Sequence, residues 1–287
     1  MATVCGRKDC LRCGGRRIYG YHTADRGDKI HSPNERNPVY FGIENELYYK
    51  DYQYNGNCIA KLVQKSFDKR GLHVCIEYDD SIGNGFEIIT QPMSYKAMVD
   101  HNFFSVYWDL RKYMRTTGTG AGMHIHMSVD HLTCIDVAKI VTFYNNNHRF
   151  IEKICNRRAT GYCPHNAQNI NDVDYFLLRY ERAGKSYDSE RGQLNLNRRN
   201  RIEFRGFKST VRPERVLKNV QHLMFLTEFV KNHEFADMTK EKYIEVLSAT
   251  PERAYLELKI WLRLYNNAEI FISKETTRQV LSIETIQ

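Results

Sequence analysis

Three short segments of the 287-residue chain carry reactive side chains at alternate positions. They place Glu44 with Glu46, His124 with His126, and Arg201 with Glu203 and Arg205. Because side chains two positions apart on an extended chain leave the same face, each segment predicts a strand with one polar face. Apolar residues dominate the alternate positions, which predicts that the opposite face of each strand is buried.

The chemistry that these residue types favour is metal binding next to an anion. Two carboxylates held a few ångström apart repel each other unless a cation lies between them or water solvates each one. Carboxylates combined with an imidazole suit Mg²⁺ or Mn²⁺. Arginines beside such ligands indicate an anion as well, and a metal-bound polyphosphate satisfies both requirements. The glycines before His124, Gly118, Gly120 and Gly122, would let the backbone approach that ligand closely, although a loose glycine repeat is weak by itself.

The elements that must position these residues are a sheet and its covering helices. Hydrophobic alternation predicts strands over 39–50, 73–78, 86–90, 117–129, 192–197 and 198–207. Helical spacing predicts helices over 56–70, 94–115, 133–157, 172–182, 239–248 and 251–265, and a further helix from Arg212 onward. The polar turn DDSIGNG favours an antiparallel hairpin that adds Glu87 to the polar face. We therefore expect an α+β fold: a curved, mainly antiparallel sheet with a polar concave face, long helices on its back and a helical C-terminal part over 212–287.

Composition limits the class of protein. Hydrophobic residues make up 42% of the chain and charged residues 26%, which is enough for a full core. No apolar run reaches the roughly 18 residues of a membrane span, and the N-terminus lacks a signal peptide, so we expect a soluble, cytoplasmic protein. Lys and Arg exceed Asp and Glu by 42 − 34 = 8, which favours anionic partners. Eight cysteines without a secretory signal are expected to be reduced thiols or metal ligands.

Residues 1–38 differ from the rest and are expected to form an extension to one domain over 39–287. This extension has little apolar periodicity, and its cysteines, Cys5, Cys10 and Cys13, could bind Zn²⁺ with His22 or His31 as the fourth ligand. Metal binding would supply folding energy that such a segment lacks. The alternative is a set of ordinary surface thiols. Farther along the chain, Cys163 and His165 could also be metal ligands, but such pairs in loops are more often incidental.

Four motifs then carry a resemblance to a family. FGIENE, DDSI with GFEIITQP, GAGMHIH and RIEFRGF occur in this order between Tyr40 and Thr210. The chain in this range resembles the ATP-dependent carboxylate-amine ligases of the glutamine synthetase and γ-glutamylcysteine ligase fold, and is most similar to their amidoligase branch. Each motif is short, but four of them in order make the resemblance fairly specific.

The resemblance implies a role for each matching residue. The implied ligands of Mg²⁺ or Mn²⁺ are Glu44, Glu46, Glu87, His124 and Glu203. The residues implied near ATP and the acyl substrate are His126, Arg199, Arg201, Arg205, Gly120 and Gly122. Two details depart from the branch: the turn Asp79-Asp80-Ser81-Ile82 lacks a glycine, and Thr90-Gln91-Pro92 stands in place of Ser-Pro-Pro. Both departures concern the substrate side and remove no metal ligand.

The implied reaction has two steps. A substrate carboxylate attacks the γ-phosphate of ATP, and an amine then displaces phosphate from the acyl phosphate to form an amide. The acid and the amine could each belong to a small molecule, a peptide or a protein. Water must be excluded from the intermediate, and the polar loop 184–191 could act as a lid.

Two other classes of function remain open at this point. A histidine-hydrophobe-histidine strand also occurs in metal-dependent nucleases of single-stranded DNA, in which Tyr175 or Tyr180 would be the nucleophile. That chemistry requires neither the Glu44–Glu46 strand nor the Arg201–Arg205 strand. The second class is a non-enzymatic nucleic-acid binder, since eight basic residues gather within 25 positions: Arg191, Arg198, Arg199, Arg201, Arg205, Lys208, Arg212 and Arg215. A degenerate ligase without activity is a further alternative.

Overall fold

The computed structural model describes residues 18, 27–51, 55–116, 120–161, 163–165, 192–196 and 200–264. The chain divides into two compact units. The first contains the residues up to His124 together with Lys208–Val216, and the second contains Ile125–Phe207 and the residues from Leu217 onward. Helices and antiparallel strand pairs occur together, which confirms the α+β class. The expected domain boundary near residue 38 stays a prediction.

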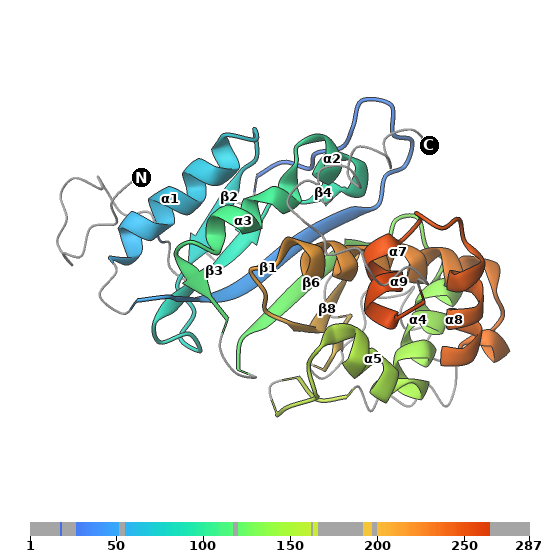
Figure 1. Cartoon of the computed structure of the whole chain (residues 1–287). Coiled ribbons are helices and arrows are strands. Elements are labelled where there is room, and N and C mark those ends of the chain that lie inside the picture. Colours follow the sequence, from blue (N-terminus) through green and yellow to red (C-terminus); the bar gives the residue numbers. More distant parts are fainter. Residues whose placement is uncertain are drawn as a thin grey trace. The chain divides into compact units, whose positions relative to one another are not determined.

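The strands of the first unit surround β1, which is the longest of them (Figure 1). Hydrogen bonds order them as β2 (Val74–Glu77), β3 (Gly85–Thr90), β1 (Tyr40–Tyr49) and the first residues of β6 (Gly122–Ser128). The two-residue strands β4 (Met93–Ser94) and β5 (Met114–Arg115) pair with opposite ends of β1. The predicted strands over 39–50, 73–78 and 86–90 and the antiparallel hairpin between the last two are therefore confirmed.

Helix α1 (Gly56–Asp68) covers one side of these strands, where it contacts β2 and the short helix α3 (Figure 1). The side chain of Asn55 caps its first turn by accepting a hydrogen bond from the Cys58 amide at 3.2 Å. Its buried residues, which include Ile59, Val63 and Phe67, recur at helical spacing, so the helix predicted over 56–70 is confirmed.

The single helix predicted over 94–115 is wrong. The structure has α2 (Tyr95–Asp100), the 3-10 turn η2 (Phe103–Ser105), α3 (Val106–Leu110) and β5 in this range. Asn102 adopts a left-handed backbone with φ of 51°, which ends α2. Met114 and Arg115 instead pair with Tyr49 and Tyr48 of β1. Helical spacing of the apolar residues could not reveal this break, because α2, η2 and α3 still bury the residues that produced the pattern, such as Met98, Phe103 and Tyr107.

The second unit continues β6 and adds two further strands and most of the helices. Hydrogen bonds order the strands as β6, β8 (Arg201–Lys208) and β7 (Leu194–Asn195). The helical elements are α4 (Cys134–Asn146), α5 (His148–Cys155), α7 (Pro213–Asn232), η3 (Phe235–Asp237), α8 (Lys240–Ala249) and α9 (Leu256–Leu262). Helix α4 contacts the apolar side of β8 through the rings of Tyr144 and Phe204, 5.6 Å apart. Helix α7 contacts β6 through the Thr227 hydroxyl, which donates to the Met127 sulfur at 3.4 Å.

Two predicted helices of this unit are shorter than expected. The helix predicted over 133–157 breaks at Asn147, whose φ of −124° is not helical. The Asn147 amide donates to the carbonyls of Phe143 at 2.8 Å and Met238 at 3.0 Å, so its side chain stabilises the break. The helix predicted over 251–265 covers only Leu256–Leu262, since Tyr255 before it adopts a left-handed backbone with φ of 54°.

Two composition-based expectations have structural counterparts. Four described cysteines, Cys75, Cys134, Cys155 and Cys163, are free thiols. Cys58 is disulfide-bonded, so the expectation of reduced thiols is wrong for it, because spacing along the chain does not show which thiols meet in the fold. No helix within the described residues combines the length and apolar character of a membrane span.

A buried histidine links three helices of the second unit. His222 of α7 is fully buried; its Nε2 lies 3.2 Å from the Tyr144 hydroxyl of α4, and its Nδ1 lies 2.7 Å from the Tyr243 hydroxyl of α8. Burial, with a smaller effect of Lys218, lowers the pKa of His222 to about 3. The native protein therefore holds this imidazole neutral at a pH where an unfolded chain would protonate it.

We predict that this histidine makes the second unit sensitive to acid. Between pH 6.5 and 3 the unfolded chain binds a proton that the native state does not, so stability is lost as the pH falls, by about 3 kcal/mol at pH 4. His222→Gln, which cannot titrate, should lose less free energy of unfolding between pH 7 and pH 4 than the natural protein does. Urea unfolding followed by Trp261 fluorescence, with Trp108→Phe in both proteins, measures this difference. Equal losses in the two proteins would contradict the assignment.

Candidate functional site

Three carboxylates form a row across three adjacent strands of the first unit. In the antiparallel register Glu87 of β3 lies opposite Glu46 of β1 on one side and opposite Glu77 of β2 on the other. Side chains at directly opposed positions have Cβ atoms about 5 Å apart. The exposed fractions of Glu46, Glu87 and Glu77 are only 8%, 4% and 0%. The fold therefore places three like-charged groups together with little water to separate them.

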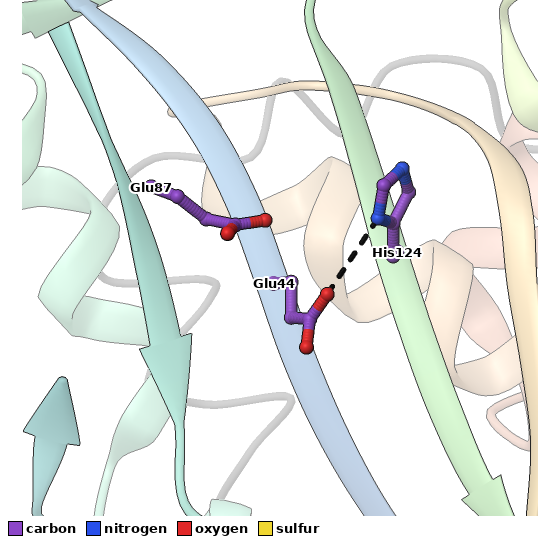
Figure 2. Close-up of side chains that lie close together, drawn as sticks. All are labelled: Glu44, Glu87 and His124. Atoms are coloured by element: carbon purple, nitrogen blue, oxygen red, sulfur yellow. Dashed lines mark ion pairs between the residues drawn. The ribbon is translucent and has the colours of Figure 1, made fainter. Parts of the chain in front are cut away.

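A carboxylate and an imidazole extend this row along β1 and β6. Oε2 of Glu44 lies 3.7 Å from Nδ1 of His124, and Oε1 of Glu46 lies 3.9 Å from Nε2 of the same ring. Figure 2 shows the side chains of Glu44, Glu87 and His124, which come from three different strands, gathered together. The alternation predicted for β1 and β6 is thus confirmed, and it brings the predicted ligands of the first unit to one place.

Two sets of side chains in this unit have a geometry that could hold a metal ion. Glu44, Glu87 and His124 form one set, and Glu46, Asp79 and Glu87 form the other; within each set the ligand atoms lie within 4.8 Å of one another. Glu87 belongs to both. Oxygen donors with one imidazole are a combination that Mn²⁺ accepts, and the all-oxygen set also suits Mg²⁺.

The pKa of Glu87 reflects its burial and the carboxylates around it. The pKa of Glu87 is raised to about 9, first by burial and then by repulsion from Glu44, Glu46, Asp79 and Glu77, in that order. At neutral pH the protein without a cation therefore holds a proton on Glu87. A divalent cation would stabilise the ionised form instead, so proton and metal compete for this carboxyl group.

Neighbouring groups hold β1 and its carboxylates in place. The backbone amide of Gly122 donates to Oε2 of Glu46 at 2.7 Å. On the opposite face of β1, the Asn45 amide donates to the carbonyl of Thr210 at 2.9 Å and accepts from the hydroxyl of Ser209 at 3.0 Å. Asn45 is 1% exposed, so these bonds satisfy a polar group inside the core. Gly122, predicted to approach a ligand, thus orients a carboxylate through its backbone.

The predicted residues of β8 belong to the second unit and form their own arrangement. Glu203 is 4% exposed, and its two oxygens accept hydrogen bonds from different groups. Arg205 donates to Oε1 at 2.6 Å, and the Asn195 amide donates to Oε2 at 2.6 Å. Arg201 and Arg205 are half-buried on the same strand. Glu203 is therefore paired with a guanidinium here, in contrast to the crowded carboxylates of the first unit.

The remaining predicted residues divide into two sets. His126 is half-buried on β6 in the second unit, and Gly120 lies in the first unit near the hydroxyl of Tyr48. Several predictions lie outside the described residues: Cys5, Cys10, Cys13 and His22 of the zinc hypothesis, Arg199, the expected lid 184–191, the helix over 172–182, and Tyr175 and Tyr180 of the nuclease alternative. They stay predictions.

Sequence reasoning missed three residues of these clusters. The sequence predicts no role for Asp79 of the hairpin turn, for Glu77 of the preceding strand or for Asn195. Register could have indicated Glu77, because an antiparallel hairpin with its turn over 79–85 sets residue 78 opposite residue 86 and therefore residue 77 opposite residue 87. Prediction of a role for Asn195 would have required knowledge that β7 pairs with β8, because this pairing sets Asn195 opposite Glu203.

Comparisons with known proteins give only a weak structural similarity. No protein-family model matches the sequence, and no curated protein matches it. Among solved structures, the chain is similar to the complex between the prokaryotic ubiquitin-like protein Pup and its ligase PafA, with a TM-score of 0.34 and 10% sequence identity. The similarity covers 86% of this chain and 62% of the other, so this chain spans less than two thirds of that chain's length. This is a weak resemblance of overall fold to a ligase.

Proposed function

We propose that this protein is an ATP-dependent ligase that joins a carboxylate to an amine through an acyl phosphate. The observation that carries this proposal is the buried cluster of Glu44, Glu46, Asp79, Glu87 and His124. Four carboxylates around one position are costly unless divalent cations offset their charge. The order of the four sequence motifs, and the residues they share with carboxylate-amine ligases, supports the same conclusion independently of the geometry.

The donor atoms of the cluster fit the cations that such a reaction uses. Carboxylate oxygens and one imidazole nitrogen would hold Mn²⁺ or Mg²⁺ through the two sets that share Glu87. When bound there, divalent cations would supply positive charge that offsets the negative charge accumulating on the phosphoryl group during transfer. The burial of these side chains favours this role, because electrostatic attraction is stronger where water is scarce.

The strand β8 supplies the groups that we assign to the anionic substrates. Arg201 and Arg205 are guanidinium donors whose fork matches phosphate and carboxylate oxygens. Asn195 and Arg205 fix both oxygens of Glu203, so the orientation of this carboxylate is set before any ligand binds. We assign Glu203 as a further metal ligand on the sequence resemblance.

The proposed reaction has two steps. An oxygen of the substrate carboxylate attacks the γ-phosphorus, the bond from phosphorus to the bridging oxygen breaks, and ADP leaves. The amine nitrogen then attacks the acyl carbon, phosphate departs with the bridging oxygen, and the amine gives up a proton to become an amide nitrogen. The arginines would neutralise the phosphoryl group in the first step and the departing phosphate in the second. His126 is the group that we assign near the acyl substrate.

Metal binding should displace a proton from Glu87. We expect calorimetric titration with Mn²⁺ at pH 7, in two buffers of different ionisation enthalpy, to show release of about one proton as the metal binds. Since the pKa of Glu87 is raised to about 9, the affinity for Mn²⁺ should increase as the pH rises from 6 toward 9. Glu87→Gln should lose this proton release and weaken binding by roughly tenfold or more.

Glu241→Gln is the matched control, because Glu241 is an exposed carboxylate on α8. This variant should bind Mn²⁺ as the natural protein does. Binding of Mn²⁺ that is unchanged in Glu87→Gln would contradict the role of the cluster.

The two histidines of β6 should give different defects. His124 lies beside Glu44 and Glu46, so His124→Gln should lower the affinity for Mn²⁺. His126→Gln should keep that affinity and instead lower the turnover or the affinity for the acyl substrate. Mn²⁺ titration and steady-state kinetics on both variants separate the two roles. Equal loss of metal affinity in the two variants would contradict the division.

The reaction itself can be tested without the natural amine. Hydroxylamine traps acyl phosphates as hydroxamates, which form coloured ferric complexes, so a panel of amino acids, dicarboxylic acids and peptides can be screened with ATP and Mg²⁺ or Mn²⁺. We expect hydroxamate and ADP in equal amounts with a suitable acid, and no product from Glu203→Gln. Metal-dependent nicking of single-stranded DNA with a covalent tyrosine adduct, and no binding of ATP, would overturn the proposal in favour of the nuclease alternative.

A further inference from the structure

Helix α5 and the turn that follows it bring together two imidazoles and a carboxylate, away from the residues assigned to the reaction. His148 and Glu152 are four residues apart and so share one face of α5. Nε2 of His165 lies 3.3 Å from Oε1 of Glu152. The rings of His148 and His165 have centroids 4.9 Å apart. All three residues belong to the second unit.

The backbone around this cluster fixes two of its members. The amide of Ala159 donates to Oε1 of Glu152 at 2.8 Å, which orients the carboxylate. Thr160 and Cys163 exchange two backbone hydrogen bonds of 3.1 and 3.0 Å, which close the turn before His165. The carbonyl of Pro164 then accepts from the amide of Gln193 at 3.0 Å. Backbone hydrogen bonds at Cys163 and Pro164 therefore hold the segment that carries His165.

A simple ion pair explains only part of this arrangement. One imidazole is enough to pair with Glu152, and such a pair at the surface is worth only up to about 1 kcal/mol. The second imidazole, His148, adds nothing to that pair, and two protonated imidazoles side by side would repel each other. Two neutral imidazoles and one carboxylate are instead a ligand set of zinc sites that keep an open position.

We propose that His148, Glu152 and His165 bind one Zn²⁺ or a similar transition-metal ion, with water completing its coordination. The side chains of His165 and Glu152 are 38% and 23% exposed, and His148 is exposed, so an ion can reach them from solvent. The ligand atoms of the three residues do not all lie within 4.8 Å of one another, so the exposed His148 ring must turn toward the other two to complete the site. The ion would join α5 to the segment 163–165. This site is independent of the proposed ligase reaction.

The sequence alone indicates a different pair of possible metal ligands in this region. Cys163 and His165 were considered as ligands because both residue types bind zinc. The structure buries Cys163, at 3% exposure, and sets Glu152 and His148 beside His165. The ligand set that we infer therefore contains no sulfur, which gives the site a distinct spectroscopic signature.

Cobalt(II) is the probe that distinguishes this site from cysteine sites. A site of two histidines and a carboxylate gives visible ligand-field bands without the near-ultraviolet charge-transfer band that thiolate ligands produce. The full chain is titrated with Co²⁺ in a Glu87→Gln background, so that the acidic cluster contributes little. We expect His148→Gln and His165→Gln each to lose one equivalent of bound Co²⁺, and to lose the sulfur-free ligand-field bands that accompany it.

His233→Gln is the matched control, since His233 is a half-buried histidine directly after α7 whose Nδ1 lies 2.9 Å from the Phe229 carbonyl oxygen. This variant should keep the full equivalent. Unchanged Co²⁺ stoichiometry in both His148→Gln and His165→Gln, or loss of the same bands from His233→Gln, would overturn the proposal.

Thermal unfolding gives a second measurement that does not depend on activity. Zn²⁺ should raise the Tm of the Glu87→Gln background and of its His233→Gln derivative, because a ligand that binds the native state stabilises it. The His148→Gln derivative should show the same Tm as the background without Zn²⁺ and a smaller rise with it. His148 is exposed on its helix, so this variant tests the site without disturbing the core. An equal rise in the His148→Gln derivative would contradict a zinc site at these residues.

Discussion

Repulsion among buried carboxylates is the constraint on which the first unit depends. Antiparallel register forces Glu46, Glu87 and Glu77 into one row, and Glu44 lies two residues farther along β1. Backbone hydrogen bonds fix where these side chains leave the sheet, because moving one of their Cβ atoms away would require a shift of register in the whole strand. Burial, and after it this repulsion, raises the pKa of Glu87 to about 9. A divalent cation would offset this repulsion, which is why the proposed function places one there.

The buried apolar residues and the polar residues of the site lie on opposite faces of the same strands. The alternate residues of β1 and β6, such as Ile43, Leu47, Met123 and Met127, are completely buried and contribute the apolar contacts. The polar face can then carry groups that destabilise one another. Asn45 is the exception on the apolar face, and its hydrogen bonds to Ser209 and Thr210 fasten β1 to a segment distant in sequence. Burial of the apolar face thus offsets the free energy that the desolvation and repulsion of the carboxylates cost.

The strands could be predicted from the sequence because each one alternates between two strongly different faces. The predicted ligands Glu44, Glu46, Glu87 and His124 meet in the structure for the same reason. The predictions were wrong where a single residue overrides the pattern, as Asn102 and Asn147 do when they interrupt helices. Glu77 and Asn195 were missed because their roles follow from pairing between strands, which periodicity within one strand does not contain.

Glu87 and Glu203 show two ways of burying a carboxylate, and the difference bears on how each would take up a metal ion. Glu87 is surrounded by other carboxylates and holds a proton, whereas Glu203 is held by the guanidinium of Arg205 and the amide of Asn195. A cation at Glu87 replaces a proton, so its binding depends on pH. A cation at Glu203, the role implied by the sequence resemblance, must instead compete with Arg205. An anion that pairs with Arg205 would relieve this competition, so the alternation of Arg201, Glu203 and Arg205 on one strand would link binding of a phosphate group to binding of the metal.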